Sequence, residues 1–263
     1  MLHATWNVLL AGARDSAAAS GAALLLATLL MAPAALATGG VEGGALPYIA
    51  ASSALELVYF GLLARAYAGG ELSVVYPVAR GSAPVLVLAI GAVALGVGPS
   101  ALEAAGVALV AAGVLIVRRP ADGAAAPGRD VAFGLAIGLC IAGYTLVDSE
   151  GLEHARPLAY LELTLIPTAA VYCGVLIARG GGADLRAAIG PHAALTGALV
   201  FGAYALVLAA LELAPAAPVA AVRESSVVIA AFMAAAFLHE RVGPARLAGS
   251  MLVAAGVAAV ALG

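Results

Sequence analysis

The sequence predicts an all-α integral membrane protein with ten transmembrane helices, arranged as two inverted repeats of five helices. Three observations lead to this fold class: an extremely apolar composition, a series of long apolar stretches, and motifs that recur in the second half. Of the 263 residues, 64% are hydrophobic and 10% are charged, whereas soluble domains are about 45–50% apolar and about 25% charged. A soluble fold of this size could not bury so many apolar side chains, so we expect a lipid bilayer around them.

Nine apolar stretches of roughly 17–24 residues are each long enough to cross a hydrocarbon layer of about 30 Å as a helix. They are expected at residues 16–38, 47–68, 72–95, 101–117, 131–149, 157–178, 190–212, 215–238 and 244–262. Residues 1–13 form a tenth, shorter stretch. Helices are the expected form because lipid-exposed strands would leave backbone groups unpaired. The many Gly and Ala residues suit close packing between such helices.

Two segments recur at one common distance along the chain. Residues 106–114 reappear as 249–257, and residues 80–85 align with 223–228, both at an offset of 143. The alternative is chance similarity between Ala- and Gly-rich helices, but the shared offset and a rare intramembrane Arg favour a repeat. Because each copy holds an odd number of spans, the second copy enters the membrane upside down, as in many secondary transporters.

The repeat sets the expected domain boundaries. We expect a first repeat at residues 1–120, a linker at 121–130 and a second repeat at 131–263. About 17 apolar residues precede Asp148 in the second repeat. Only six residues of any kind precede Asn7, the equivalent polar position in the first repeat. The first helix is therefore expected to be truncated at its N-terminus, as a start codon assigned too late would cause.

Three motifs carry a family resemblance: His3-Ala-Thr-Trp-Asn7, Tyr76-Pro-Val-Ala-Arg-Gly-Ser-Ala-Pro84 and Arg223-Glu-Ser-Ser-Val227. Together with the Ala/Gly-rich helix that ends each half, they resemble the EamA-type family of the drug/metabolite transporter superfamily. This resemblance implies ten helices, a central cavity between the repeats, and transport of small metabolites by alternating access. One feature departs from the family pattern, because Gly96-Val-Gly-Pro99 replaces the acidic residue after the fourth helix, whereas Glu240 is present in the second half.

Ionisable side chains inside apolar spans are costly, and by default they mark a functional site. Arg80 and Arg223 coincide under the repeat offset, and prolines lie close to both, which favours broken helices near a binding region. We expect at least one of them to hold an anionic group of the substrate through paired hydrogen bonds. The alternative is that each Arg snorkels or forms a purely structural ion pair with Glu56 or Glu224.

Other candidates share helix faces, because residues three or four apart on a helix are neighbours. This spacing relates Glu56 to Tyr59, Tyr76 to Arg80, and Tyr144 to Asp148. Asp148 could equally be a solvated helix end, and Trp6 an interfacial residue. The predicted substrate-binding residues are Arg80, Arg223, Glu224, Tyr76, Glu56, Tyr59, Trp6, Asn7, Tyr144, Asp148 and Ser226.

These features predict a secondary transporter, an exporter or exchanger of small polar metabolites such as amino acids or organic acids. The expected location is the cytoplasmic (inner) membrane of a bacterium-like cell. Protons could be the coupling ion, because Glu56, Asp148 and Glu224 could titrate when desolvated. Two alternatives stay open: multidrug efflux of lipophilic compounds, against which two buried arginines argue, and a non-transporting accessory membrane subunit.

An enzyme is not expected, because the sequence contains no nucleophile elbow, phosphate loop, dinucleotide fingerprint or zinc motif. No catalytic residue, metal or cofactor is therefore predicted. The net charge of -3 and the lack of a basic stripe also give no reason to expect a nucleic-acid partner. The predicted partners are a small-molecule substrate and the bilayer, and the oligomeric state is left open.

Overall fold

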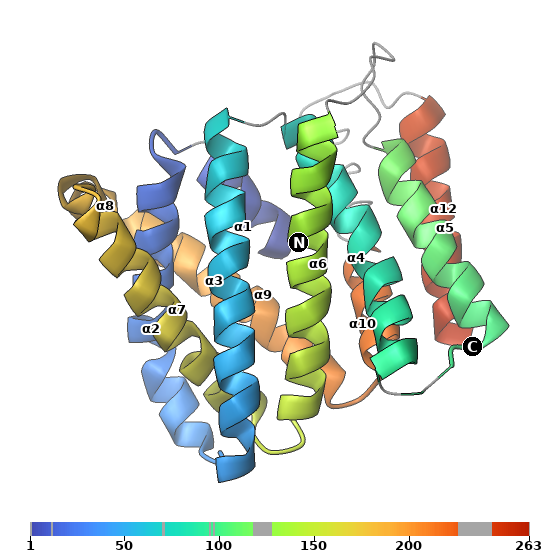
Figure 1. Ribbon diagram of the computed structural model, residues 1–263, viewed down its shortest axis with the longest axis horizontal. Coiled ribbons are helices and arrows are strands. Elements are labelled where there is room, and N and C mark those ends of the chain that lie inside the picture. The colour runs from blue at the N-terminus through green and yellow to red at the C-terminus, as the bar shows by residue number, and fades with distance from the viewer. Residues whose placement is uncertain are drawn as a thin grey trace. The chain divides into compact units, whose positions relative to one another are not determined.

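The computed structural model describes residues 2–11, 13–69, 72–94, 96, 98–117, 128–225 and 244–262. Over these residues the chain is built from α-helices joined by short connections (Figure 1), so the expected all-α class is confirmed. The chain divides into two compact units, and each takes helices from both halves of the sequence. Unit 1 comprises residues 69–146 and 214–263, and unit 2 comprises residues 2–68 and 147–213.

Helix α6 contributes to both units, since it covers Gly128–Gly151 and the division falls after Leu146. The other helices of unit 1 are α4 (Leu72–Ala94), α5 (Ala101–Val117), α10 (Ala216–Arg223) and α12 (Pro244–Leu262). Unit 2 contains α1 (Leu2–Ala11), α2 (Ser16–Thr38), η1 (Gly43–Ala45), α3 (Leu46–Gly69), α7 (Pro157–Ala178), α8 (Gly182–Ala188) and α9 (Pro191–Leu211).

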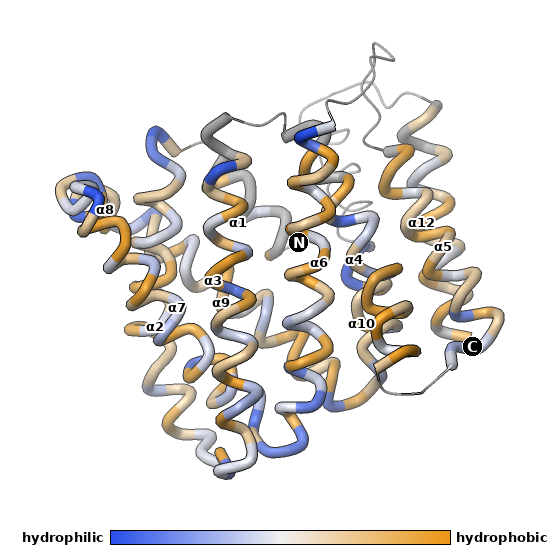
Figure 2. Tube along the Cα trace, in the orientation of Figure 1, coloured by the Kyte–Doolittle hydropathy of each residue, from blue (hydrophilic) through white to orange (hydrophobic). Residues whose placement is uncertain are grey.

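Within the described part of the chain, five helices are long and apolar enough to cross a membrane: Ser16–Thr38, Gly43–Ala66, Gly128–Gly151, Pro157–Ala178 and Pro191–Leu211. Shorter apolar helices cover Val78–Ala94, Ala101–Ile116 and Ala248–Val260. Figure 2 shows hydrophobic residues along the helices and hydrophilic ones at α8 and between α6 and α7. These spans agree with the multi-pass membrane protein that the composition predicts.

The predicted span boundaries agree closely with the helices. The spans at 16–38, 101–117 and 157–178 coincide with α2, α5 and α7. Helix α10 covers the beginning of the span expected at 215–238, and most of the remainder lies outside the described residues. The short helix α8 was not predicted, because it lies in residues 179–189, between the spans expected at 157–178 and 190–212.

Close glycine contacts join α5 to α12 in unit 1. Gly106 and Gly113 lie two turns apart on α5, as do Gly249 and Gly256 on α12. A Cβ atom added to Gly106 would lie 2.8 Å from the Gly256 carbonyl oxygen, and one added to Gly113 would lie 2.6 Å from that of Gly249. Only glycine permits this approach, which is typical of helices that associate without a hydrophobic driving force.

Polar side chains join α3 to α7 in unit 2. The Ser53 hydroxyl bonds to the carbonyl of Ile49 in its own helix and also lies 2.9 Å from the carbonyl oxygen of Thr164. The Thr168 hydroxyl lies 3.3 Å from the Ser53 carbonyl oxygen. Because all of these groups are buried, the contacts satisfy polar atoms that lipid could not. They hold one face of α3, which also carries Ser52 and Glu56, against neighbouring helices.

Candidate functional site

In unit 1 the buried side chains of Arg80, Arg223 and Glu224 lie together and are here called the arginine cluster. The Nε atom of Arg80 lies 3.0 Å from Glu224 Oε2, and the Nε atom of Arg223 lies 3.9 Å from Glu224 Oε1. Glu224 is fully buried, and the side chains of Arg80 and Arg223 are 4% and 6% exposed. Because a guanidinium stays charged in proteins, two buried cations lie beside the one carboxylate of Glu224.

Arg223 is the less well satisfied of the two arginines. Its Nε, Nη1 and Nη2 atoms are buried and have no hydrogen-bond partner within the described ranges, and its 3.9 Å contact with Glu224 is too long for a hydrogen bond. The residue ends α10, where the negative end of the helix dipole favours a cation. The end of α10 therefore presents a charged donor group for which the described residues supply no hydrogen-bond acceptor.

Unit 2 contains a second buried polar group, formed by Ser52, Glu56, Asp148, Tyr160 and Tyr204 and here called the carboxyl cluster. The Tyr160 hydroxyl donates to Asp148 Oδ1 at 3.0 Å, and the Tyr204 hydroxyl donates to Asp148 Oδ2. Asp148 is fully buried. Two neutral donors, one from α7 and one from α9, thus stabilise the carboxylate of Asp148 in the last turn of α6.

Helix α3 supplies the remaining members of the carboxyl cluster. Ser52 and Glu56 lie one turn apart, and both are buried. The Ser52 side chain lies beside Asp148 and Tyr160, and Glu56 interacts electrostatically with the same two groups. Among the described residues, neither Glu56 nor Asp148 forms an ion pair. The cluster therefore contains two carboxyl groups held among neutral hydroxyl groups.

Gly151 makes room for the Tyr160 ring at the end of α6. A Cβ atom added at Gly151 would lie 2.7 Å from the Tyr160 hydroxyl oxygen and still closer to its ring. The lack of a side chain there allows the tyrosine of α7 to reach Asp148, three residues earlier on α6. Gly151 is thus part of the geometry that positions this donor.

The other predicted site residues have different surroundings. Trp6 is buried in an apolar cluster with Leu10, Leu63, Val200 and Ala203, and Tyr59 packs against this cluster. Tyr144 is buried in the part of α6 that belongs to unit 1, one turn before Asp148. Ser226 and the side chains of Asn7 and Tyr76 lie outside what the structure describes.

Sequence reasoning missed Ser52, Tyr160 and Tyr204. The two tyrosines stand in apolar stretches, where an aromatic ring reads as a hydrophobic residue. A buried tyrosine hydroxyl nevertheless requires a hydrogen-bond partner, so its position in a span was a usable signal. The spacing of Ser52 and Glu56, four residues apart on one helix face, was a second signal.

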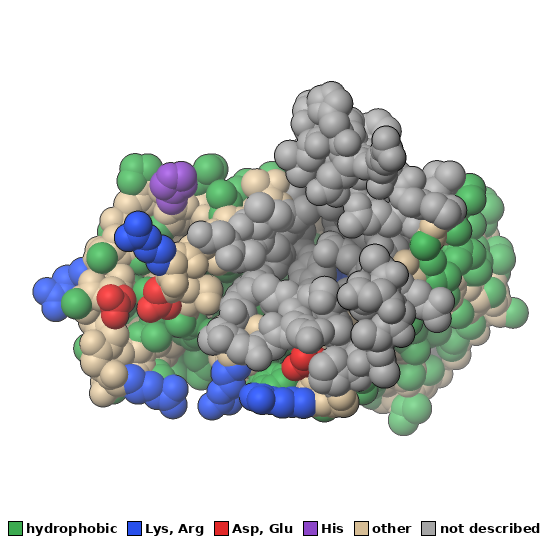
Figure 3. Space-filling model, turned by 90° about the horizontal axis from the view of Figure 1, so that it is seen from above, with side chains coloured by type: hydrophobic (Ala, Val, Ile, Leu, Met, Phe, Trp, Pro, Cys, Tyr) green, Lys and Arg blue, Asp and Glu red, His purple; other side chains and the backbone are tan. Residues whose placement is uncertain are grey.

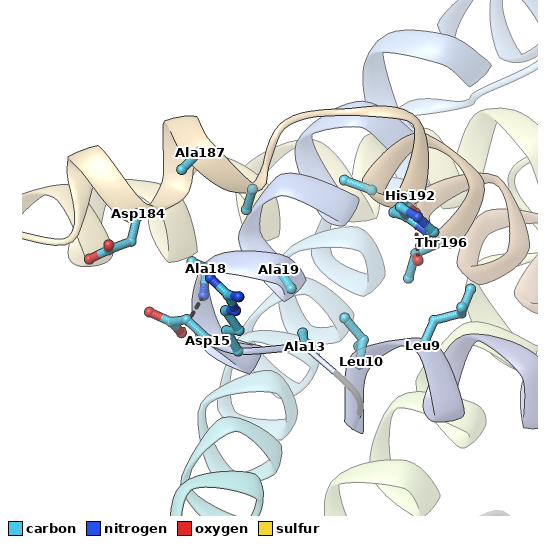
Figure 4. Close-up of a pocket in the computed structure, with 13 residues that line it drawn as sticks. Leu9, Leu10, Ala13, Asp15, Ala18, Ala19, Asp184, Ala187, His192 and Thr196 are labelled. Carbon is cyan, nitrogen blue, oxygen red and sulfur yellow. Dashed lines mark hydrogen bonds between the residues drawn. The ribbon is translucent and has the colours of Figure 1, made fainter.

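A cavity of about 730 Å³ opens at another place in unit 2, between α1, α2, α8 and α9. Figure 4 shows Asp15, Asp184 and His192 around it, with Leu9, Leu10 and several Ala side chains between them. Figure 3 shows charged and His side chains gathered at the end of unit 2 that carries α8. Asp15 caps α2 by accepting hydrogen bonds from the amides of Ala17 and Ala18. Since these charges are exposed, water satisfies them and they do not require a ligand.

Two of three comparisons relate the chain to other proteins. In the third, no curated protein matches it. A solved crystal structure is similar over 99% of this chain and 93% of its own, with a TM-score of 0.74 and 15% sequence identity, which shows a shared fold. A model described as the EamA-like transporter family matches residues 129–262, slightly more than half of the chain. The chain therefore belongs to the EamA-like transporter family, whose members are membrane transporters of the drug/metabolite transporter superfamily.

Proposed function

We propose that the chain is a secondary transporter, an exporter or exchanger, of small polar metabolites that carry an anionic group, such as amino acids or organic acids. The observation that carries this proposal is Arg223, a buried guanidinium whose three nitrogen atoms have no hydrogen-bond partner in the described chain. We propose that the arginine cluster binds the anionic group of the substrate.

The energetics of the arginine cluster support an anionic ligand. A buried donor without an acceptor costs about 1–3 kcal/mol, and more when it is charged. A substrate carboxylate could accept two parallel hydrogen bonds from one guanidinium. It would also lie beside the guanidinium of Arg223, which is 3.9 Å from Glu224, whereas Arg80 is 3.0 Å from the same carboxylate. The guanidinium of Arg223 would repel a lipophilic cation, which disfavours multidrug efflux through the same site.

The helix contacts support alternating access by inverted repeats. The offset of 143 residues relates Gly106 to Gly249 and Gly113 to Gly256. Gly106 approaches Gly256, and Gly113 approaches Gly249, so each contact is the counterpart of the other. Reciprocal contacts of this kind are the mark of a twofold relation. The same offset relates Arg80 to Arg223, so we propose that the two arginines occupy equivalent positions in the two repeats.

A thermal-shift screen of the purified protein tests the anionic-ligand proposal, because a ligand that binds the folded state raises its melting temperature. The panel should contain amino acids, monocarboxylates and dicarboxylates, each beside its uncharged amide. We expect at least one acid to stabilise the protein and its amide to have no effect. Stabilisation by lipophilic cations alone would contradict the proposal.

Substitutions then test which residue binds the acid. Arg223→Lys and Arg80→Lys should both abolish counterflow of the stabilising acid in proteoliposomes while the protein still inserts and folds, because an ammonium cannot reproduce the two parallel bonds. Arg65→Lys, at an exposed position of α3, is the matched control. Wild-type counterflow by both cluster variants would refute the anion site. Absence of any flux in the reconstituted wild-type protein, despite ligand binding, would favour an accessory subunit.

A further inference from the structure

We propose that Glu56 is the proton-binding group that couples transport to a proton gradient, and that Asp148 is the fixed negative charge beside it. This inference rests on the proposed transport function, but it concerns the carboxyl cluster of unit 2 rather than the arginine cluster. Its basis is the unequal surroundings of two buried carboxyl groups that act on one another.

Both oxygen atoms of Asp148 have hydrogen-bond donors among the described residues, whereas Oε2 of Glu56 has none. Each oxygen atom of Asp148 accepts a hydrogen bond from a tyrosine, one from α7 and one from α9, and donors of this kind favour the ionised form. Glu56 is 5% exposed, and its Oε2 atom has no hydrogen-bond partner in the described part of the chain. Ionised Glu56 would place a second, unbalanced negative charge in the same buried cluster, which is costly. Glu56 is therefore the group that holds the proton.

The charged and titratable groups around Glu56 come from each neighbouring helix. They are Asp148 of α6 and Tyr160 of α7, with Tyr204 of α9 reaching the cluster through Asp148. Tyr59 lies three residues from Glu56 on α3 itself. Within the described chain, every partner of the two carboxyls is thus a hydroxyl group or the other carboxyl, and such a group can bind a cation.

The burial of the carboxyl cluster favours a proton over a larger cation. Asp148, Ser52 and Tyr160 have no exposed surface, and none of the cluster residues lines the cavity of about 730 Å³ in the same unit. The hydrogen atoms of both tyrosine hydroxyls point at Asp148, so the carboxylate oxygens of Asp148 are already occupied by donors. In the described chain no group of three or more His, Cys, Asp or Glu could hold a metal ion.

The proposed step is a reversible protonation. A proton from water on one side of the membrane binds a carboxylate oxygen of Glu56 and forms an O–H bond. When the cluster opens to the other side, that bond breaks, the proton returns to water and the carboxylate is restored. Asp148 stays ionised throughout, so the closed cluster carries one negative charge with the proton and two without it. Closure is therefore favourable only when the proton is bound, which is the requirement for coupling.

Currents recorded after pH steps test the proton site without any substrate. Wild-type proteoliposomes adsorbed on a supported membrane should give a transient current after each step, which protein-free liposomes should lack. Glu56→Gln, which mimics the protonated side chain, should abolish the transient. Glu162→Gln is the matched control, since Glu162 is also a buried Glu with an unbonded Oε2 atom, but lies on α7. It should keep the wild-type transient.

The outcomes separate the competing explanations. A wild-type protein without a transient, or a Glu56→Gln variant that keeps it, would overturn the proposal. A transient produced by sodium steps at constant pH would also overturn it, in favour of a metal cation. If Glu56→Gln does not fold, as judged by size exclusion, Glu56→Asp should move the pH of half-maximal charge displacement, and an unchanged midpoint would count against Glu56. The arginine variants should keep the pH-step transient, so failure of the anion site and failure of the proton site are distinguishable.

Discussion

Both units bury charge among apolar helices, but they stabilise it differently. In unit 1, Glu224 lies between two guanidinium groups, so the charge is balanced by opposite charge. In unit 2, Asp148 is held by the hydroxyl groups of Tyr160 and Tyr204, and its nearest charged neighbour in the cluster is another carboxyl group. Over the described residues, unit 1 thus places two guanidinium groups beside one carboxylate, and unit 2 places two carboxyl groups beside neutral hydroxyls. The comparison suggests that the two units bind ligands of opposite sign, an anionic substrate and a proton.

The largest effect is expected from removing the charge of Glu224. Glu224→Gln removes the carboxylate charge that lies 3.0 Å from Arg80 and 3.9 Å from Arg223, which should cost about 3–5 kcal/mol of unfolding free energy. Chemical denaturation in detergent would measure this loss, and size exclusion would show a depleted folded fraction. Glu212→Gln, at an exposed position after α9, should leave the unfolding free energy unchanged. A Glu224→Gln protein as stable as wild type would contradict charge balance in unit 1.

Removing the donors of unit 2 should have a smaller effect, because each tyrosine contributes a single hydrogen bond. Tyr204→Phe and Tyr160→Phe should each lower the unfolding free energy by about 1.5–3 kcal/mol, the usual contribution of a hydrogen bond to a charged group. The same denaturation experiment measures both variants. Tyr48→Phe is the control, since Tyr48 stacks on His154 and is only half-buried. Two variants with wild-type stability would show that the tyrosines do not support Asp148.

The two clusters also differ in how far sequence could predict them. Arg80 and Arg223 were identifiable because an Arg inside an apolar span is rare, and because both fall on one repeat offset. Tyr160 and Tyr204 were not, since the choice of Asp148 as their acceptor depends on which helices are neighbours in space. No sequence spacing relates α7 and α9 to the end of α6. The charged members of both clusters, including Glu56 and Asp148, were therefore predictable, and the neutral donors around Asp148 were not.

The helices themselves were largely predictable, because apolar length and polar connections are local properties. The span expected at 157–178 begins at Pro157 and ends before Gly180-Gly181-Gly182, and α7 has the same limits. Helix α8 was missed because only seven residues form it, too few for a clear periodic pattern. The division into two units could not be read from the sequence, because each unit combines segments from both halves.

A substitution in the glycine contact would sharpen the comparison of the units by testing backbone packing rather than charge. In Gly256→Ala the new Cβ atom would lie 2.5 Å from the Gly106 carbonyl oxygen. Since that atom belongs to the backbone, α5 and α12 must separate, which should cost about 1–3 kcal/mol of unfolding free energy. Gly174→Ala on α7, where nothing lies within 4 Å of the added carbon, is the control. Equal stability of the two variants would contradict close packing of α5 on α12.

The smallest effect concerns the exposed charges beside the cavity in unit 2, which contrast with the buried carboxyls of the same unit. Asp15→Ala removes the acceptor of two amide hydrogen bonds at the start of α2, each 2.9 Å long. The loss of such a cap should lower the unfolding free energy by about 1 kcal/mol, and Asp15→Asn should restore most of it because its side-chain oxygen can also accept. Asp184→Ala removes an exposed carboxylate from the same cavity, and the melting temperature should stay at its wild-type value. A larger loss from Asp184 than from Asp15 would mean that the cavity charges act together, as they would in a ligand site. The expected order would instead show that these exposed carboxylates have only a local structural role, in contrast to the buried carboxyl groups that we propose as the proton site.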